Sequence, residues 1–121
     1  MPPYTVQTAP GQLLLAEYRR LKLLEWLHVE GRKMGWLAKQ VGLSSSWLTQ
    51  ILHRKVLMSD KLAAQLQAQF GIELYAPVYP VIVLQDLQDY IATRTDDSTM
   101  KLWKLRSKQR YVPAVAQIVA S

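Results

Sequence analysis

Apolar residues recur at helical spacing along the first quarter of the chain. Leu14, Leu21, Leu24 and Leu27 fall on one side of a helix that we predict over residues 12–29, a stretch without Gly or Pro. Further apolar side chains lie on a second side of the same helix. A helix that is apolar on two sides must be covered from two directions. We therefore expect it to contact its own domain and also either the C-terminal region or a second subunit.

Two shorter helices, predicted over residues 34–40 and 45–53, come next. Gly42 separates them, and a Gly at this point can take the positive φ that a tight turn between helices requires. Ser44 or Ser45 can cap the second of these helices, because a Ser hydroxyl accepts a hydrogen bond from the N–H groups at a helix start.

A fourth helix is predicted over residues 61–70, with Ser59 or Asp60 as its cap and Gly71 as its end. Apolar residues recur every four positions along it and indicate its buried side. The basic stretch HRKVLMSDK connects it to the helix before.

The pattern changes after residue 75. The stretch VIVLQDLQDYIATR fits a strand, from its β-branched start, or a helix that begins at Pro80. We favour the helix, because Leu84, Leu87 and Ile91 keep helical spacing. KLWKLRSKQRYVP, further on, fits a helix that docks on the rest of the molecule with a basic side toward DNA phosphates. A second DNA contact without docking and a membrane-surface segment are the alternatives.

Charge divides the chain into three parts. The formal net charge is +6, from 15 basic and 9 acidic side chains. Residues 1–75 hold nine basic and five acidic side chains, residues 76–99 hold one and four, and residues 100–121 hold five and none. A basic balance suggests a polyanionic partner. A modest excess of Lys also keeps an ordinary domain soluble, so the charge needs a motif before it identifies a partner.

Composition argues against several other classes. Cys is absent, which excludes disulfide scaffolds and thiolate metal sites and makes a reducing cytoplasm the expected compartment. No run approaches the roughly 20 apolar residues that a membrane-spanning helix needs. Residues 1–11 lack the basic start and apolar length of a signal peptide, and we expect a flexible lead there.

The two short helices have the spacing of a helix-turn-helix. Ala38 is small enough to let the second helix cross closely, Gly42 makes the turn, and Leu48 and Ile51 anchor the second helix in the core. Five polar residues are then left on the outside: Ser45, Ser46, Thr49, Gln50 and His53.

On these residues the chain resembles the lambda-repressor and Cro-like helix-turn-helix superfamily, the XRE family. The resemblance covers about residues 21–74, because SDKLAAQLQAQFGIEL after the motif looks like the closing helix of that family. It implies a mainly α fold, a compact four- to five-helix repressor-like domain with a C-terminal extension that is helical or holds a short strand. The expected parts are a flexible lead (1–11), a helix-turn-helix DNA-binding domain (12–75) and an unrecognised extension for dimerisation or partner binding (76–121).

The resemblance also implies roles for individual residues, because in that family the second motif helix lies in the major groove. Carried over to this chain, the base contacts are Ser45, Ser46, Thr49 and Gln50, with Trp47 and His53 as further candidates. Gln50 is the strongest of them, since its amide can pair with two atoms of adenine, a contact worth about 1–3 kcal/mol of discrimination. The implied phosphate contacts are Lys33, Ser44, Arg54 and Lys55. Such serines and cations can also be ordinary capping and solvated residues, but a motif helix without any acidic residue favours DNA contact.

Catalytic and metal-binding patterns are weak. His28 and His53 have no carboxylate at ligand spacing near either of them. Asp96 and Asp97 precede Ser98 and a predicted helix, as capping residues do. No glycine-rich phosphate loop or nucleophile motif is present. We therefore expect neither an enzyme nor a cofactor or metal site.

Together these patterns predict a sequence-specific regulator that binds double-stranded DNA, a repressor acting as a homodimer on a palindromic operator. The resemblance places such a protein in the cytoplasm or on the nucleoid of a bacterium, with a phage or bacterial origin. An antitoxin or adaptor whose C-terminal tail binds a partner protein is one alternative. A basic platform for DNA or RNA without sequence preference is another.

Overall fold

The computed structural model describes residues 9–75 and 84–96, and this part of the chain forms five helices and no strand. The helices are α1 (Ala9–Glu30), α2 (Met34–Val41), α3 (Ser45–Leu52), α4 (Asp60–Phe70) and α5 (Leu84–Asp96). The mainly α class predicted from the sequence is therefore confirmed. None of these helices is long and apolar enough to cross a membrane. The basic stretch 101–113 lies outside the described residues.

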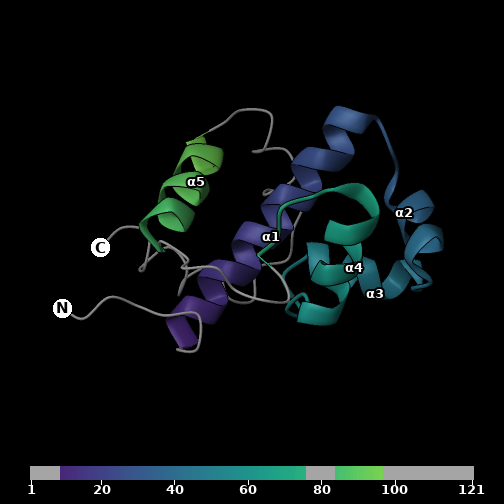
Figure 1. The fold of residues 1–121 in the computed structure, drawn as a ribbon, viewed down its shortest axis with the longest axis horizontal. Coiled ribbons are helices and arrows are strands. Elements are labelled where there is room, and N and C mark those ends of the chain that lie inside the picture. Colours follow the sequence, from purple (N-terminus) through teal and green to yellow (C-terminus); the bar gives the residue numbers. More distant parts are fainter. Residues whose placement is uncertain (1–8, 76–83, 97–121) are drawn as a thin grey trace.

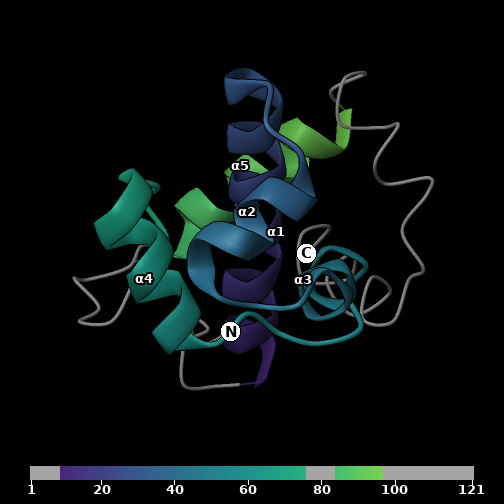
Figure 2. The same cartoon turned by 90° about the vertical axis from the view of Figure 1, so that its right-hand side faces the viewer.

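α1 runs through the middle of the molecule and the other helices lie around it (Figure 1). α5 lies on one side of α1 and α2 on the opposite side, with α3 and α4 flanking it (Figure 2). α1 packs against both α3 and α5, and α2 packs against α3. The helix that is apolar on two sides is thus covered from two directions, once by the helix-turn-helix and once by the C-terminal region.

α1 begins three residues earlier than the sequence predicts, at Ala9 rather than residue 12. The flexible lead expected over residues 1–11 is therefore wrong for its last three residues. Pro10 fits within the first helical turn, because the N–H that Pro lacks would have no carbonyl partner there. The bounds of α2, α3 and α4 differ from the predicted ones by one residue at most.

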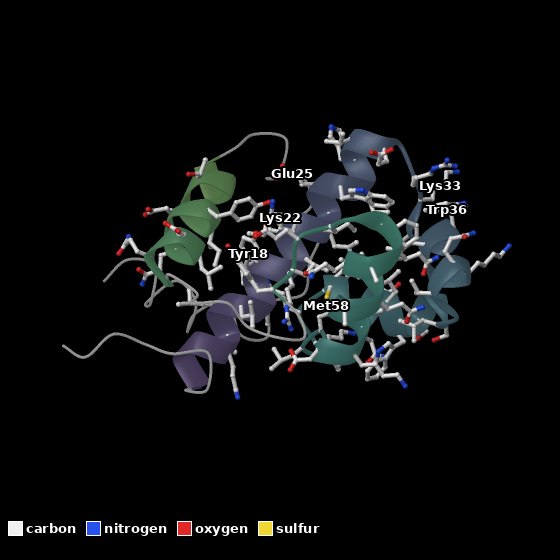
Figure 3. All side chains as sticks on the ribbon, viewed as in Figure 1. Tyr18, Lys22, Glu25, Lys33, Trp36 and Met58 are labelled. Atoms are coloured by element: carbon white, nitrogen blue, oxygen red, sulfur yellow. The ribbon has the colours of Figure 1, made fainter. Side chains whose placement is uncertain are left out.

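α5 confirms the predicted helix over residues 84–94, whereas the β-branched start at residues 81–83 lies outside the described residues. Leu87 and Ile91, one helical turn apart, are both buried. Next to them, the Tyr90 ring meets the Tyr18 ring of α1 edge-on at 5.0 Å, and the Tyr90 hydroxyl donates to Glu25 Oε2 at 2.7 Å. Figure 3 shows Tyr18 and Glu25 on the stretch of α1 that faces α5. The second apolar side of α1 is consequently covered within the chain rather than left for a second subunit.

The turn between α2 and α3 follows from two residues. Gly42 has a φ of 71°, a left-handed conformation that costs Gly little, and its N–H donates to the carbonyl of Ala38. The N–H of Leu43 donates to the same carbonyl at 3.0 Å. Ala38, Leu48 and Ile51 are buried, as a closely crossing pair of helices requires.

α4 is tied to its neighbours by polar side chains. Ser59 is its cap, with Oγ accepting from the N–H of Leu62, so the cap is Ser59 rather than Asp60. Gln65 Nε2 donates to the Val41 carbonyl, and Gln69 Nε2 donates to the Gln40 carbonyl, each at 3.3 Å. These bonds satisfy carbonyls at the C-terminal end of α2, which have no partner inside the helix. α4 therefore helps to fix where the helix-turn-helix begins its turn.

Candidate nucleic-acid interface

The outward surface of α3 consists of polar side chains and one aromatic ring. Ser45, Ser46 and Trp47 are exposed, and Thr49 and Gln50 are half-buried. Trp47 has 43 % of its surface exposed. The helix contains no acidic residue at all. Such a surface offers hydroxyl and amide groups to a partner and repels no phosphate.

Ser44 begins α3 as its cap, the first of the two candidates named by the sequence. Its backbone is extended, and its Oγ accepts a hydrogen bond from the N–H of Trp47 at 3.0 Å. That bond does not use the hydroxyl proton of Ser44, which can still be donated to a phosphate oxygen. The cap and the predicted phosphate contact are therefore compatible in one side chain.

Thr49 is more restricted than the sequence suggests. Its hydroxyl donates to the Ser45 carbonyl one turn earlier, at 2.7 Å, and lies 3.5 Å from Sδ of Met34. A hydroxyl has one proton, so Thr49 retains only its oxygen lone pairs and its methyl group for a base edge. A methyl contact with thymine fits these groups.

Gln50 remains the residue best suited to base recognition. Its backbone carbonyl accepts the N–H of Lys55 at 2.9 Å, which closes the turn after α3. Its side-chain amide forms no hydrogen bond with any residue in the described ranges. A half-buried amide with both of its polar groups available can pair with adenine in two places. His53, the other candidate on this side, caps the C-terminal end of α3 and is half-buried.

Exposed cations lie beside this surface. Lys33 and Lys55 are exposed, at the start of α2 and in the turn after α3. The contact between Met34 and Thr49 places the start of α2 next to the outward side of α3. Lys33 lies on the side of the molecule opposite α5 (Figure 3).

Arg32 is an exposed cation just before α2 that the sequence patterns did not single out, and its aromatic contact lies toward α1 and α4. It is exposed, and its guanidinium carbon lies 4.5 Å from the ring centre of Trp36, a cation–π contact that limits the motion of the side chain. Trp36 in turn packs on Trp26 and Phe70. The sequence signal that could have indicated this contact is the spacing of four residues between Arg32 and Trp36 at the start of a helix.

Arg54 corrects the predicted set of phosphate contacts. Only 3 % of its surface is exposed, so it cannot reach a phosphate on a DNA backbone. Its Nε lies 3.1 Å from both carboxylate oxygens of Glu17 and its Nη2 lies 2.8 Å from Oε2 of the same group. The backbone of Arg54 has a φ of 63°, which turns the side chain inward toward α1. Assigning Arg54 to the DNA backbone was therefore wrong, whereas its neighbour Lys55 is exposed as predicted.

Metal ligands do not gather in the part of the chain that the structure describes. Over residues 9–75 and 84–96 no three His, Asp or Glu side chains approach one another closely enough to hold a metal ion. His28 is on α1 and His53 ends α3.

Comparison with models of protein families, with curated proteins and with solved structures finds no match for this chain. The functional assignment therefore depends on the residues and the geometry described above.

Proposed function

We propose that this chain is a transcriptional regulator that binds double-stranded DNA in a sequence-specific way, with α3 as its recognition helix. The observation that supports this most directly is the combination of hydroxyl and amide groups on the outward side of α3 with exposed cations beside it, Lys33 at the start of α2 and Lys55 in the turn after α3. An α-helix fits the major groove of B-DNA, where each base pair displays a distinct set of donors and acceptors. The role is that of a binding protein, and no step of it requires catalysis.

In the proposed complex the residues divide into two groups. Ser45, Ser46 and Gln50 meet base edges, and the methyl group of Thr49 meets a thymine. The cations beside α3, with the hydroxyl of Ser44, contact phosphates and fix the position of the helix in the groove. Gln50 supplies the largest share of discrimination because it alone in this group can form a bidentate contact.

The regulator acts as a homodimer that represses the genes it binds, in the cytoplasm or on the nucleoid of a bacterium. One recognition helix distinguishes only a few base pairs, and two helices related by symmetry recognise two half-sites of a palindrome. Because α5 covers the second apolar side of α1, the dimer surface lies elsewhere than on that side of α1. Occupied operators would exclude polymerase from the promoter.

Selection of bound duplexes from a random-sequence pool, combined with a mass measurement in solution, tests the proposal. We expect a palindromic motif whose half-site centres are about 34 Å apart, roughly one helical turn, and a dimeric mass. Binding without any enriched motif would favour a sequence-independent platform instead. The absence of duplex binding at low salt would contradict the proposal entirely.

A further inference from the structure

The end of α3 is joined to α1 by a buried cluster of three charged side chains, Glu17, Arg20 and Arg54. Each has 3 % or less of its surface exposed. Arg54 binds the Glu17 carboxylate through Nε and Nη2, as described above. Arg20, one turn along α1 from Glu17, donates from Nε to the carbonyl of Leu52 at 2.6 Å and lies with Nη1 3.5 Å from Glu17 Oε1. We refer to these residues as the Glu17 cluster.

The Glu17 cluster contacts α3 at its last turn and just beyond it. Leu52 is the final residue of α3, and its carbonyl is one of those that lack a partner inside the helix. Arg54 follows two residues later with a left-handed backbone, which a residue other than Gly adopts at some cost and keeps only where the surroundings require it. Glu17 and Arg20, which lie one turn apart on α1, thus bind the chain where α3 ends and where it turns away from the helix.

Charges in this position are a costly way to gain stability. Removing carboxylate and guanidinium groups from water offsets most of their attraction, so apolar residues of similar volume would often stabilise the fold as well or better. Directional bonds do provide something that apolar packing does not, because a bidentate guanidinium fixes an angle as well as a distance. The Glu17 cluster is therefore suited to fixing the orientation of α3 relative to α1.

We infer that Arg54 is a positioning residue for the recognition helix, acting through Glu17 and together with Arg20. This inference rests on the proposed function, because it concerns how α3 is presented to a major groove. Arg54 touches no DNA. It sets the angle at which Ser46 and Gln50 reach base edges, so it governs the choice between sequences rather than the general attraction to phosphate.

Two variants at adjacent positions separate this role from phosphate contact. Arg54→Met and Lys55→Ala each remove one positive charge, the first from a buried residue and the second from an exposed one. Arg54→Met leaves Glu17 beside Arg20, a pair without net charge, so the variant is expected to fold. The affinities of each full-length variant are measured for a duplex selected by the unmodified chain and for a scrambled duplex, at several salt concentrations.

For Arg54→Met we expect the ratio of the two affinities to fall at least about tenfold, as for a lost base contact, with an unchanged salt slope on the scrambled duplex. For Lys55→Ala we expect the slope to fall by about 0.9 and the ratio to stay within about twofold. A mere loss of stability would lower the folded fraction and both affinities together, leaving the ratio unchanged. The ratio is thus a measurement that a purely structural role of Arg54 would not alter.

An unchanged ratio in Arg54→Met, or a salt slope that falls as in Lys55→Ala, would overturn the inference. If Arg54→Met does not fold, Arg54→Lys replaces it, because Lys keeps the charge but cannot form the bidentate contact. A reduced ratio at constant slope is then the supporting result, and a ratio equal to that of the unmodified chain overturns the inference. If the unmodified chain itself shows no preference between duplexes, the proposed function fails and the inference with it.

Discussion

Glu17 is a buried carboxylate that faces two guanidinium groups, those of Arg20 and Arg54. Removing the negative charge would leave two buried positive charges close together. Removing Arg54 instead would leave one carboxylate and one guanidinium. The two substitutions therefore differ in the charge that remains inside the protein, although each removes one member of the same ion pair.

Glu17→Gln is expected to lower the free energy of unfolding by about 3–5 kcal/mol, as the breaking of buried ion pairs generally does. Arg54→Met is expected to cost clearly less, because the Glu17–Arg20 pair persists. Urea unfolding followed by circular dichroism measures both. An equal loss of unfolding free energy in the two variants would show that the charge left in the core does not determine the cost.

Capping, turn and apolar core residues could be predicted from the sequence, and the partners of buried charged side chains could not. Ser44 and Gly42 act through the chain next to them, as a cap and a turn; spacing identified Gly42 and limited the cap to Ser44 or Ser45. Arg54 differs because its environment is formed by α1, 37 residues earlier. The available hint was Glu17 itself, a carboxylate in a helix that is apolar on two sides.

At the scale of elements, the helix-turn-helix depends on backbone conformation at Gly42. With a φ of 71°, this position favours Gly over any residue with a Cβ, although a Cβ there would meet no atom within 4 Å. Gly35 in α2 offers a matched comparison, because it also has open space but an ordinary backbone. Substitution by Ala therefore tests conformation alone at both positions.

Gly42→Ala should lower the free energy of unfolding by about 1–2 kcal/mol, from the strain of a left-handed Ala. Gly35→Ala should raise it by about 0.5–1 kcal/mol, because Ala loses less backbone entropy in a helix than Gly. Thermal or urea unfolding of the two variants measures the difference. A destabilising Gly35→Ala would mean that α2 is not helical at its start.

The buried surroundings of Tyr18 on α1 give the fold a dependence on alkaline pH. Burial, with the nearby Tyr75 and Glu73 charges adding to it, raises the pKa of Tyr18 well above its ordinary value of 10.0. The folded protein therefore keeps the Tyr18 proton when the unfolded chain loses it. The contribution of Tyr18 to stability is complete below pH 10 and declines as the pH rises above that value.

Tyr18→Phe removes this titration and should make the free energy of unfolding fall less steeply above pH 10 than in the unmodified chain. Urea unfolding between pH 8 and about 11.5 measures the slope. The two proteins have all their lysines in common, so the comparison isolates the effect of the Tyr18 hydroxyl. If the unfolding free energy falls equally steeply with pH in both proteins, groups other than Tyr18 cause the alkaline dependence.

At the scale of the whole molecule, the described residues place acidic side chains on α5 and basic ones at the start of α2. α5 carries the exposed carboxylates of Asp86 and Asp89, whereas the exposed Lys33 lies on the opposite side of the molecule, beyond α1 (Figure 3). Such a separation orients a protein toward a polyanion before contact. The segment charges indicated an acidic stretch between two basic ones, but not that its helix α5 would cover α1 on the side opposite α2.

Lys33→Ala should reduce the slope of log affinity against log salt by about 0.9 for any duplex, the value for one lost phosphate contact. Asp89→Asn, at the opposite end, changes net charge without removing a contact and should leave the slope unaltered. Fluorescence anisotropy at several salt concentrations measures both. Equal slopes for Lys33→Ala and the unmodified chain would remove Lys33 from the interface.

The central claim, that α3 recognises base pairs, is tested most directly by the affinity of Gln50→Ala for the selected duplex relative to a scrambled one. Gln85→Ala, an exposed Gln on α5, is the matched control. We predict that Gln50→Ala lowers this ratio by about 5- to 150-fold, the equivalent of 1–3 kcal/mol, and that Gln85→Ala leaves it unchanged. A Gln50→Ala variant with the ratio of the unmodified chain would contradict the account.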